Sequence, residues 1–253
     1  MSNAFGDIIR EWRDLRRLSQ LQLSLEAGMS ARHLSFLESG RSRPSRAMVL
    51  RLTDALAMPK ETANRALHSA GFAPVYPALP FDDKALEPVR NAVKMMLDNH
   101  APFPGVAIDR WWNITDANHG AAALFAAVGV GGSANMLEVM LELGDGSTVE
   151  NWEDNALIIL SRLKSEIIHY GGDDKLEDFA DRFARHSRLQ AFKSTADYSQ
   201  AVVPTVLRLE DVRLSLFSTI AHFGSVQDIG ASDIRIELMF PADEATRDYF
   251  EGG

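Results

Sequence analysis

Two short helices joined by a tight turn are predicted within residues 19–44, and this arrangement constrains the fold more than any other feature of the chain. The first helix is expected over Ser19–Ala27, where a serine hydroxyl can cap the first turn and apolar residues are spaced to face a core. Gly28 ends this helix. Ser30 then caps a second helix, which is expected from Ala31 to about Ser39.

This layout is typical of a helix-turn-helix motif, in which the second helix enters the major groove of DNA. Arg32 is predicted to recognise guanine, because a guanidinium can satisfy the O6 and N7 acceptors together, and Phe36 is predicted to touch a thymine methyl. Gln20 lies in the first turn of the first helix, where it is placed to bond a phosphate. The residues expected to contact DNA are Gln20, Ser30, Ala31, Arg32, His33, Ser35, Phe36, Arg41, Arg43 and Arg46.

Charge is distributed unevenly along the chain. Residues 1–72 hold 11 Lys and Arg against 7 Asp and Glu, a net charge of +4, whereas the whole chain carries −9. A basic N-terminal segment in an otherwise acidic chain is expected when that segment binds a polyanion such as DNA. Two amphipathic helices joined by glycine also occur in small helical domains that bind no ligand, and the arginines around the motif favour the DNA-binding interpretation.

The surrounding residues predict a five-helix domain. Apolar stripes at residues 5–15 and 48–56 indicate helices on either side of the motif, Ser45 is a cap, and Pro59 opens a fifth helix that ends near Gly71. The pattern S-Q-x-x-L-x-x-x-A-G-x-S-x-x-x-L-S-x-L-E-x-G-R-x-x-P-S is matched from residue 19 to residue 45. Residues 5–72 therefore resemble the DNA-binding domain of the lambda-repressor-like (Cro/CI, or XRE) family. Many relatives carry Gln where this chain has Ala31, so their base preference does not carry over.

Three prolines in residues 73–83 bar a regular helix and predict a stiff linker between a head of residues 1–72 and a larger domain of residues 84–253. At 253 residues and 46% hydrophobic content, the chain is long enough for this second core. The chain has no cysteine, which excludes a disulfide and a thiolate metal site. No apolar run approaches ~18 residues and no leader is seen, so a cytoplasmic protein without membrane insertion is expected.

The larger domain is predicted to be α+β. Its expected elements are helices over residues 86–99 and 118–128, a helical stretch over residues 135–186, short strands over residues 106–109 and 112–117, and three antiparallel strands after residue 202. Apolar residues alternate with polar ones in these last three segments, as in a sheet with one covered face. The order of elements resembles a PAS-like fold, in which an antiparallel sheet and its covering helices enclose a cavity.

Two segments carry a closer resemblance. DRWWNITDANHGAAALF at residues 109–125, with Trp112, Asn113 and Asn118 in a W-N-x-x-x-x-N pattern, and LSLFSTIAHFGSVQDI with IELMFPAD at residues 214–243 are similar to the MmyB-like ligand-binding domain of bacterial regulators. The resemblance implies a lipophilic, fatty-acid-like effector. Large flexible and aromatic residues suit such a pocket, although they also suit a plain core. The predicted ligand-binding residues are Met96, Trp112, Met140, Phe217, His222, Phe223, Met239 and Phe240.

Enzyme signatures are weak. Residues 129–134 satisfy a loose G-x-G-x-x-A pattern, but they follow a helix instead of leading into one, so a flexible loop is expected. The histidines show no metal-ligand spacing, and neither catalytic residues nor a cofactor are predicted. The sequence favours a DNA-binding regulator that acts as a homodimer on double-stranded DNA and responds to a small lipophilic ligand. The alternative is a regulator whose second domain serves only dimerisation or protein interaction.

Overall fold

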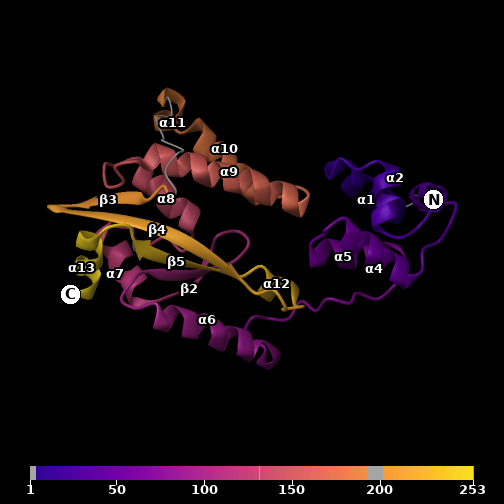
Figure 1. Cartoon of the computed structure of the whole chain (residues 1–253), viewed down its shortest axis with the longest axis horizontal. Coiled ribbons are helices and arrows are strands. Elements are labelled where there is room, and N and C mark those ends of the chain that lie inside the picture. Colours follow the sequence, from indigo (N-terminus) through magenta and orange to yellow (C-terminus); the bar gives the residue numbers. More distant parts are fainter. Residues whose placement is uncertain (1–3, 131, 193–201, 253) are drawn as a thin grey trace. The chain divides into compact units, whose positions relative to one another are not determined.

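The computed structural model describes residues 4–130, 132–192 and 202–252, and Figure 1 shows its helices and strands. The chain forms two compact units. One contains the residues up to Ala78 together with the short segments Ser165–Asp173 and Gln227–Ile229, and the other contains the remaining residues. Gly131, which falls in the loop expected at residues 129–134, lies outside the described residues.

The first unit contains five helices around one apolar core, as predicted. The helices are α1 (Ala4–Leu15), α2 (Gln20–Glu26), α3 (Ala31–Glu38), α4 (Arg46–Ala55) and α5 (Lys60–Ser69). Ile9, Leu23, Leu34, Leu37 and Leu52 are fully buried in this core. Each side chain comes from the apolar face of its helix, so the burial of these faces holds the five helices together.

The caps that the sequence predicted are present. Ser19 and Gln22 form a reciprocal capping box at the start of α2. Ser30 accepts a hydrogen bond from the backbone amide of His33, which fixes the first turn of α3. Gly28 has a φ of 62°, a conformation that glycine adopts without a steric penalty, and this allows the tight turn between α2 and α3.

The predicted linker begins packed against the head. The Asn64 side chain of α5 accepts hydrogen bonds from the backbone amides of Val75 and Tyr76 and donates one to the Tyr76 carbonyl. These bonds satisfy backbone groups of a segment that cannot form a helix. The first part of the linker is therefore held to α5 by one side chain.

The second unit is an α+β domain with a five-stranded antiparallel sheet, which confirms the predicted fold class. The strand order is β2-β1-β5-β4-β3. The strands are β1 (Gly105–Ile108), β2 (Ile114–Ala117), β3 (Thr205–Leu209), β4 (Val212–His222) and β5 (Arg235–Pro241). The helices are η1 (Lys84–Leu86), α6 (Glu87–Asn99), α7 (His119–Ala127), α8 (Met136–Gly144), α9 (Trp152–Tyr170), α10 (Asp174–Arg185), α11 (Ser187–Ala191), α12 (Ile229–Ser232) and α13 (Glu244–Glu251).

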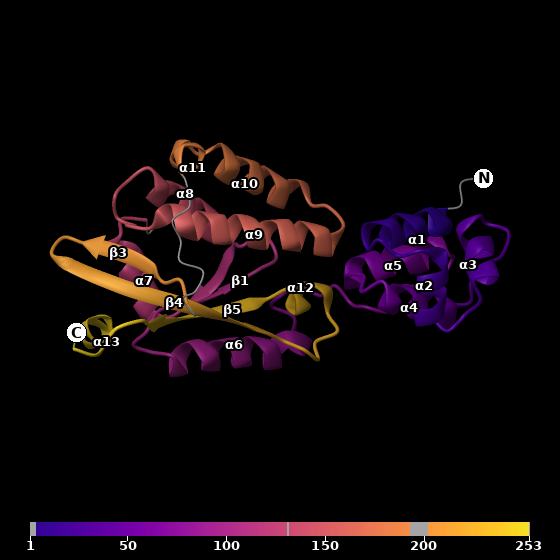
Figure 2. The same cartoon turned by 45° about the horizontal axis from the view of Figure 1, so that its top comes forward.

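Helices cover both faces of this sheet. Helix α6 lies along one face, and α8 and α9 lie along the other (Figures 1 and 2). On the α6 side, Val93 and Leu97 pack with Ala107 of β1 and Ile236 of β5 in one buried cluster. The α8 and α9 side is packed less completely, and the cavity described below lies there.

The strand expected over residues 112–117 begins later than predicted, at Ile114. Trp112 instead adopts a left-handed backbone conformation with a φ of 67°. The carboxylate of Asp109 accepts hydrogen bonds from the amides of Trp111 and Asn113, which curls residues 109–113 into a turn before the strand starts. The last helix, α13, was not predicted from the sequence.

Candidate functional site

Helix α3 presents the surface expected to contact DNA. Leu34 and Leu37 are buried in the core of the head, whereas the Arg32 side chain is exposed and His33, Ser35 and Phe36 are half-buried. Ser30 and Ala31 begin the helix, so their backbone amides lie at its N-terminus. The N-terminal end of this helix is the part that reaches base edges in helix-turn-helix proteins.

Two arginines lie against the ring of Phe36. The guanidinium carbon of Arg32 is 5.4 Å from the ring centroid, and that of Arg41 is 5.9 Å away. Contacts of this kind are cation–π interactions, which restrict a long side chain before it binds a partner. Phe36 therefore holds both guanidinium groups near the exposed face of α3, in addition to the thymine contact that the sequence predicts for it.

The other predicted DNA contacts come from segments next to α3 in the chain. Arg41, Arg43 and Arg46 are exposed and follow α3 in the chain. The Gln20 side-chain amide donates a hydrogen bond of 2.8 Å to Glu38, so the structure shows a structural role for Gln20 that the sequence analysis missed. Glu38 also binds Arg13 and thereby raises the pKa of that guanidinium above its usual value. The phosphate contact of Gln20 stays a prediction.

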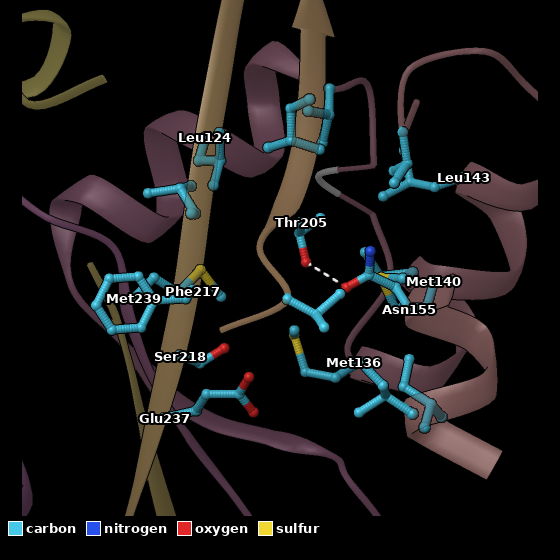
Figure 3. A pocket seen from close by; sticks show the side chains of 18 of the residues that line it. Leu124, Met136, Met140, Leu143, Asn155, Thr205, Phe217, Ser218, Glu237 and Met239 are labelled. Carbon is cyan, nitrogen blue, oxygen red and sulfur yellow. Dashed lines mark hydrogen bonds between the residues drawn. The ribbon is translucent and has the colours of Figure 1, made fainter. Parts of the chain in front are cut away.

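A cavity of about 500 Å³ lies between the sheet and helices α7, α8 and α9 of the second unit. Its wall is mostly apolar, with Leu124, Met136, Met140 and Leu143 on the helices and Met239 on β5 (Figure 3). Ligand-binding pockets in proteins typically measure about 300–1,000 Å³ and have this largely apolar character. The cavity therefore has the size and lining of a site for a small lipophilic molecule.

The structure places four of the eight predicted ligand-binding residues on the cavity wall. These are Trp112, Met140, Phe217 and Met239. The others lie elsewhere: Met96 and Phe223 pack with the α6 cluster on the opposite face of the sheet, Phe240 stacks on Phe217 and contacts His100, and His222 is exposed at the end of β4. Side chains alternate between the faces of a strand, which explains why Met239 reaches the cavity and Phe240 does not.

Polar residues on the wall were missed by the sequence analysis. Asn155 and Arg162 of α9 line the cavity together with Thr205 and Glu237 of the sheet. Asn155 accepts a hydrogen bond of 2.7 Å from the Thr205 hydroxyl (Figure 3). Residues seven apart lie on the same face of a helix. Two polar residues at positions 155 and 162, on a helix otherwise rich in leucine and isoleucine, could therefore have indicated a polar patch on a buried face.

Two arginines of the sheet, Arg213 and Arg235, have partners outside the cavity. Arg213 donates a hydrogen bond of 2.8 Å to Glu150 at the surface. This bond and the interaction of Glu150 with Arg208 lower the pKa of the Glu150 carboxyl below its usual value. Arg235 is buried, and its Nη2 donates to the backbone carbonyl of Asp109 at 2.9 Å. Neither is among the described residues that line the cavity.

Trp112 is held in the wall by a network of hydrogen bonds. Asn135 at the start of α8 donates from its side-chain amide to the Trp111 carbonyl and to the side-chain oxygen of Asn113, at 2.8 and 2.9 Å. A left-handed conformation is unfavourable for a bulky residue by about 1–3 kcal/mol. The contacts of Asp109 and Asn135 offset this strain, and the indole ring packs against the guanidinium group of Arg162 at 4.0 Å.

The described part of the chain contains neither a cluster of metal-binding side chains nor a helix that could span a membrane. Across residues 4–130, 132–192 and 202–252, no group of three or more His, Cys, Asp and Glu side chains is arranged to hold a metal ion. In the same part of the chain, no helix combines the length and the apolar character needed to cross a bilayer.

Comparison with known protein families supports both parts of the chain. A helix-turn-helix family model matches residues 9–61, which include α2 and α3. A second model, described as the MmyB-like transcription regulator ligand binding domain, matches residues 89–251 and so includes the whole sheet and the cavity. No curated protein matches the chain. The second match covers more than half of the chain, so the chain belongs to the family of transcription regulators with an MmyB-like ligand-binding domain.

Proposed function

We propose that this regulator binds specific DNA sequences through α3 and that a small lipophilic, fatty-acid-like effector in the cavity modulates this binding. The observation that carries the proposal is the cavity of about 500 Å³ with its mostly apolar wall. A domain that served only as an interaction module would gain stability from filling such a space, because unfilled apolar cavities are destabilising. The effector must bind the DNA-competent and incompetent arrangements with different affinities.

The regulator is proposed to act as a homodimer. Helix-turn-helix proteins of this kind place two recognition helices in successive major grooves, on half-sites about one helical turn, or ~34 Å, apart. The exposed arginines around α3 supply the positive charge for phosphate contacts on each half-site. The effector then acts by favouring or disfavouring the arrangement in which both heads reach their half-sites.

Lipid extraction of the purified protein tests the ligand part of this proposal. We expect a long-chain lipophilic compound to be released from the wild type and identified by mass spectrometry. Ser218→Phe should reduce the recovery of this compound, because Ser218 lines the cavity and a phenyl group there occupies part of its volume. Thr219→Phe is the matched control, since the next residue of β4 points to the other face. Consistently empty wild-type protein would favour the interaction module.

Substitutions of two arginines test the DNA-binding part. Arg32→Ala should relax the preference at one base position, with a loss of about 1–3 kcal/mol there, whereas Arg43→Ala should weaken binding to all sequences similarly. The measurement is fluorescence polarisation with fragments of the protein's own promoter and their single-base variants, at several salt concentrations. Unchanged discrimination in Arg32→Ala would remove Arg32 from base recognition, and binding without salt dependence would contradict the proposal as a whole.

A further inference from the structure

One part of the cavity wall is exposed to solvent. Among the lining residues in the described part of the chain, the exposed ones are Ile158 of α9, Val202, and Ser218 and Ile220 of β4. Nη1 of Arg162, one turn after Ile158 on α9, lies 3.7 Å from Oε2 of Glu237 on β5. Glu237 lies opposite Ile220 in the sheet, so the exposed residues of α9 and β4 are close together. We call Ile158, Ser218 and Ile220 the mouth of the cavity.

The charged residues of the wall also lie at the mouth. Arg162 and Glu237 are the only charged residues among the described lining residues, and their side chains are 21% and 13% exposed. Their opposite charges compensate each other. The exposed Ser218 adds a hydroxyl that can donate or accept a hydrogen bond. The mouth therefore offers partners to acidic, basic and uncharged polar head groups alike.

The opposite end of the cavity is closed and apolar. Leu216 lies four residues before Ile220 on the same face of β4, which separates the two by roughly 13 Å. Leu216 is 3% exposed, whereas Ile220 is 36% exposed. In Figure 3 the buried residues Leu124 and Leu143 lie at the other end of the wall from Ser218. Burial of the wall therefore increases with distance from the mouth along β4.

The polar groups between the two ends are already bonded within the protein (Figure 3). The Thr205 hydroxyl donates to the side-chain oxygen of Asn155 at 2.7 Å, and the Asn155 amide donates to the Asn151 carbonyl at 3.0 Å. Burying a polar group without a hydrogen-bond partner is unfavourable, whereas burying an alkyl chain against apolar side chains is favourable. A lipid therefore gains most when the end of its chain lies at the closed end and its head lies at the mouth.

We propose that the cavity binds single-chain lipids chain first, so that the polar head lies at the mouth and is selected neither by its size nor by its charge. This inference rests on the proposed function, because it requires that the cavity binds a lipophilic molecule. The chain then defines the ligand class: a free fatty acid binds, and so does the same acyl chain attached to a polar group larger than the cavity. Arg162, Glu237 and Ser218 meet the head, and the closed end determines which chains fit.

Isothermal titration calorimetry of the delipidated full-length protein tests this orientation with three ligands of the same chain length, each below its critical micelle concentration. The polyethylene glycol ester of dodecanoate, whose uncharged polymer head is larger than the cavity, is expected to bind within about threefold of dodecanoate itself. Dodecanedioate carries a second carboxylate at the end of the chain. It should bind at least about 100-fold more weakly than dodecanoate, because that carboxylate would be buried at the closed end.

The three ligands separate failure of this inference from failure of the proposed function. If dodecanoate binds and the ester does not, the head is enclosed and the chain-first orientation is wrong, while the proposed function stands. Dodecanedioate that binds as tightly as dodecanoate would contradict the orientation in the same way. If none of the three binds, the proposed function fails as well.

Opposite charges at position 158 locate the head independently of its size. Ile158→Lys and Ile158→Glu remove the same side chain, which is 47% exposed. Ile158→Lys should bind dodecanoate about fivefold more tightly than Ile158→Glu, and both should bind the uncharged ester alike. Met95→Lys and Met95→Glu, at an exposed position of α6 on the other face of the sheet, are the matched controls and should bind dodecanoate equally. Equal affinities of the two Ile158 variants for dodecanoate would place its carboxylate away from the mouth and overturn the inference.

Discussion

Replacing Asn118 by aspartate is expected to destabilise the ligand-binding domain by at least about 3 kcal/mol. The buried side chain of Asn118 makes four hydrogen bonds: its oxygen accepts from the amides of Gly105 and Ala121, and its Nδ2 donates to the carbonyls of Leu97 and Phe103 at 3.0 and 2.9 Å. Aspartate keeps the acceptor but places a second oxygen against two carbonyl oxygens. Two hydrogen bonds are lost and a buried charge is left without a partner.

Thermal unfolding followed by differential scanning calorimetry checks this expectation. For a domain of this size, such a loss lowers the melting temperature by about 10 °C. Asn91→Asp makes the same chemical change at an exposed position of α6 and should alter the stability by less than about 0.5 kcal/mol. Equal melting temperatures for the two variants would show that the hydrogen bonds of Asn118 do not hold the domain together.

Asn118 shows which contacts of a residue can be predicted from the sequence and which cannot. Asn118 directly precedes an alanine-rich run, which is a typical place for a helix cap, and its side chain accepts a hydrogen bond from the Ala121 amide. The bonds to Leu97, Phe103 and Gly105 join the end of α6 and the start of β1 to the same side chain, from 13 to 21 residues away. Local spacing determines a helix cap, whereas such distant partners depend on the fold of the whole domain.

The cavity likewise combines features that follow from local sequence patterns with features that depend on the tertiary fold. Alternating apolar residues predict the strands β3, β4 and β5, and the structure confirms them. Met96 and Met140 both lie on amphipathic helices, but only Met140 reaches the cavity, because α6 and α8 cover opposite faces of the sheet. The Arg162–Glu237 pair joins residues far apart in the sequence. Helical and strand periods identify apolar faces, and tertiary packing decides what each face meets.

The second large effect is expected in the head, where Glu38→Gln should lower the stability by about 3 kcal/mol. The Glu38 side chain is only 2% exposed and accepts hydrogen bonds from Nε and Nη2 of Arg13, at 2.8 and 3.2 Å, and from Gln20 at 2.8 Å. Arg10 lies 3.9 Å away. Breaking a buried ion pair by removing one partner typically costs about 3–5 kcal/mol, and the half-exposed Arg10 places this case at the lower end.

This substitution should also impair DNA binding, although Glu38 does not lie on the exposed face of α3. Its contacts join α3 to Arg13 of α1 and Gln20 of α2, so Glu38 sets the position of α3 within the motif. The melting temperature of the head should fall by on the order of 15 °C, measured by circular dichroism, with a parallel loss of promoter affinity. Glu26→Gln, which is exposed at the end of α2, should change neither quantity. If Glu38→Gln melts as the wild type but loses affinity, Glu38 acts on DNA binding directly; if both are unchanged, the buried network is not what positions α3.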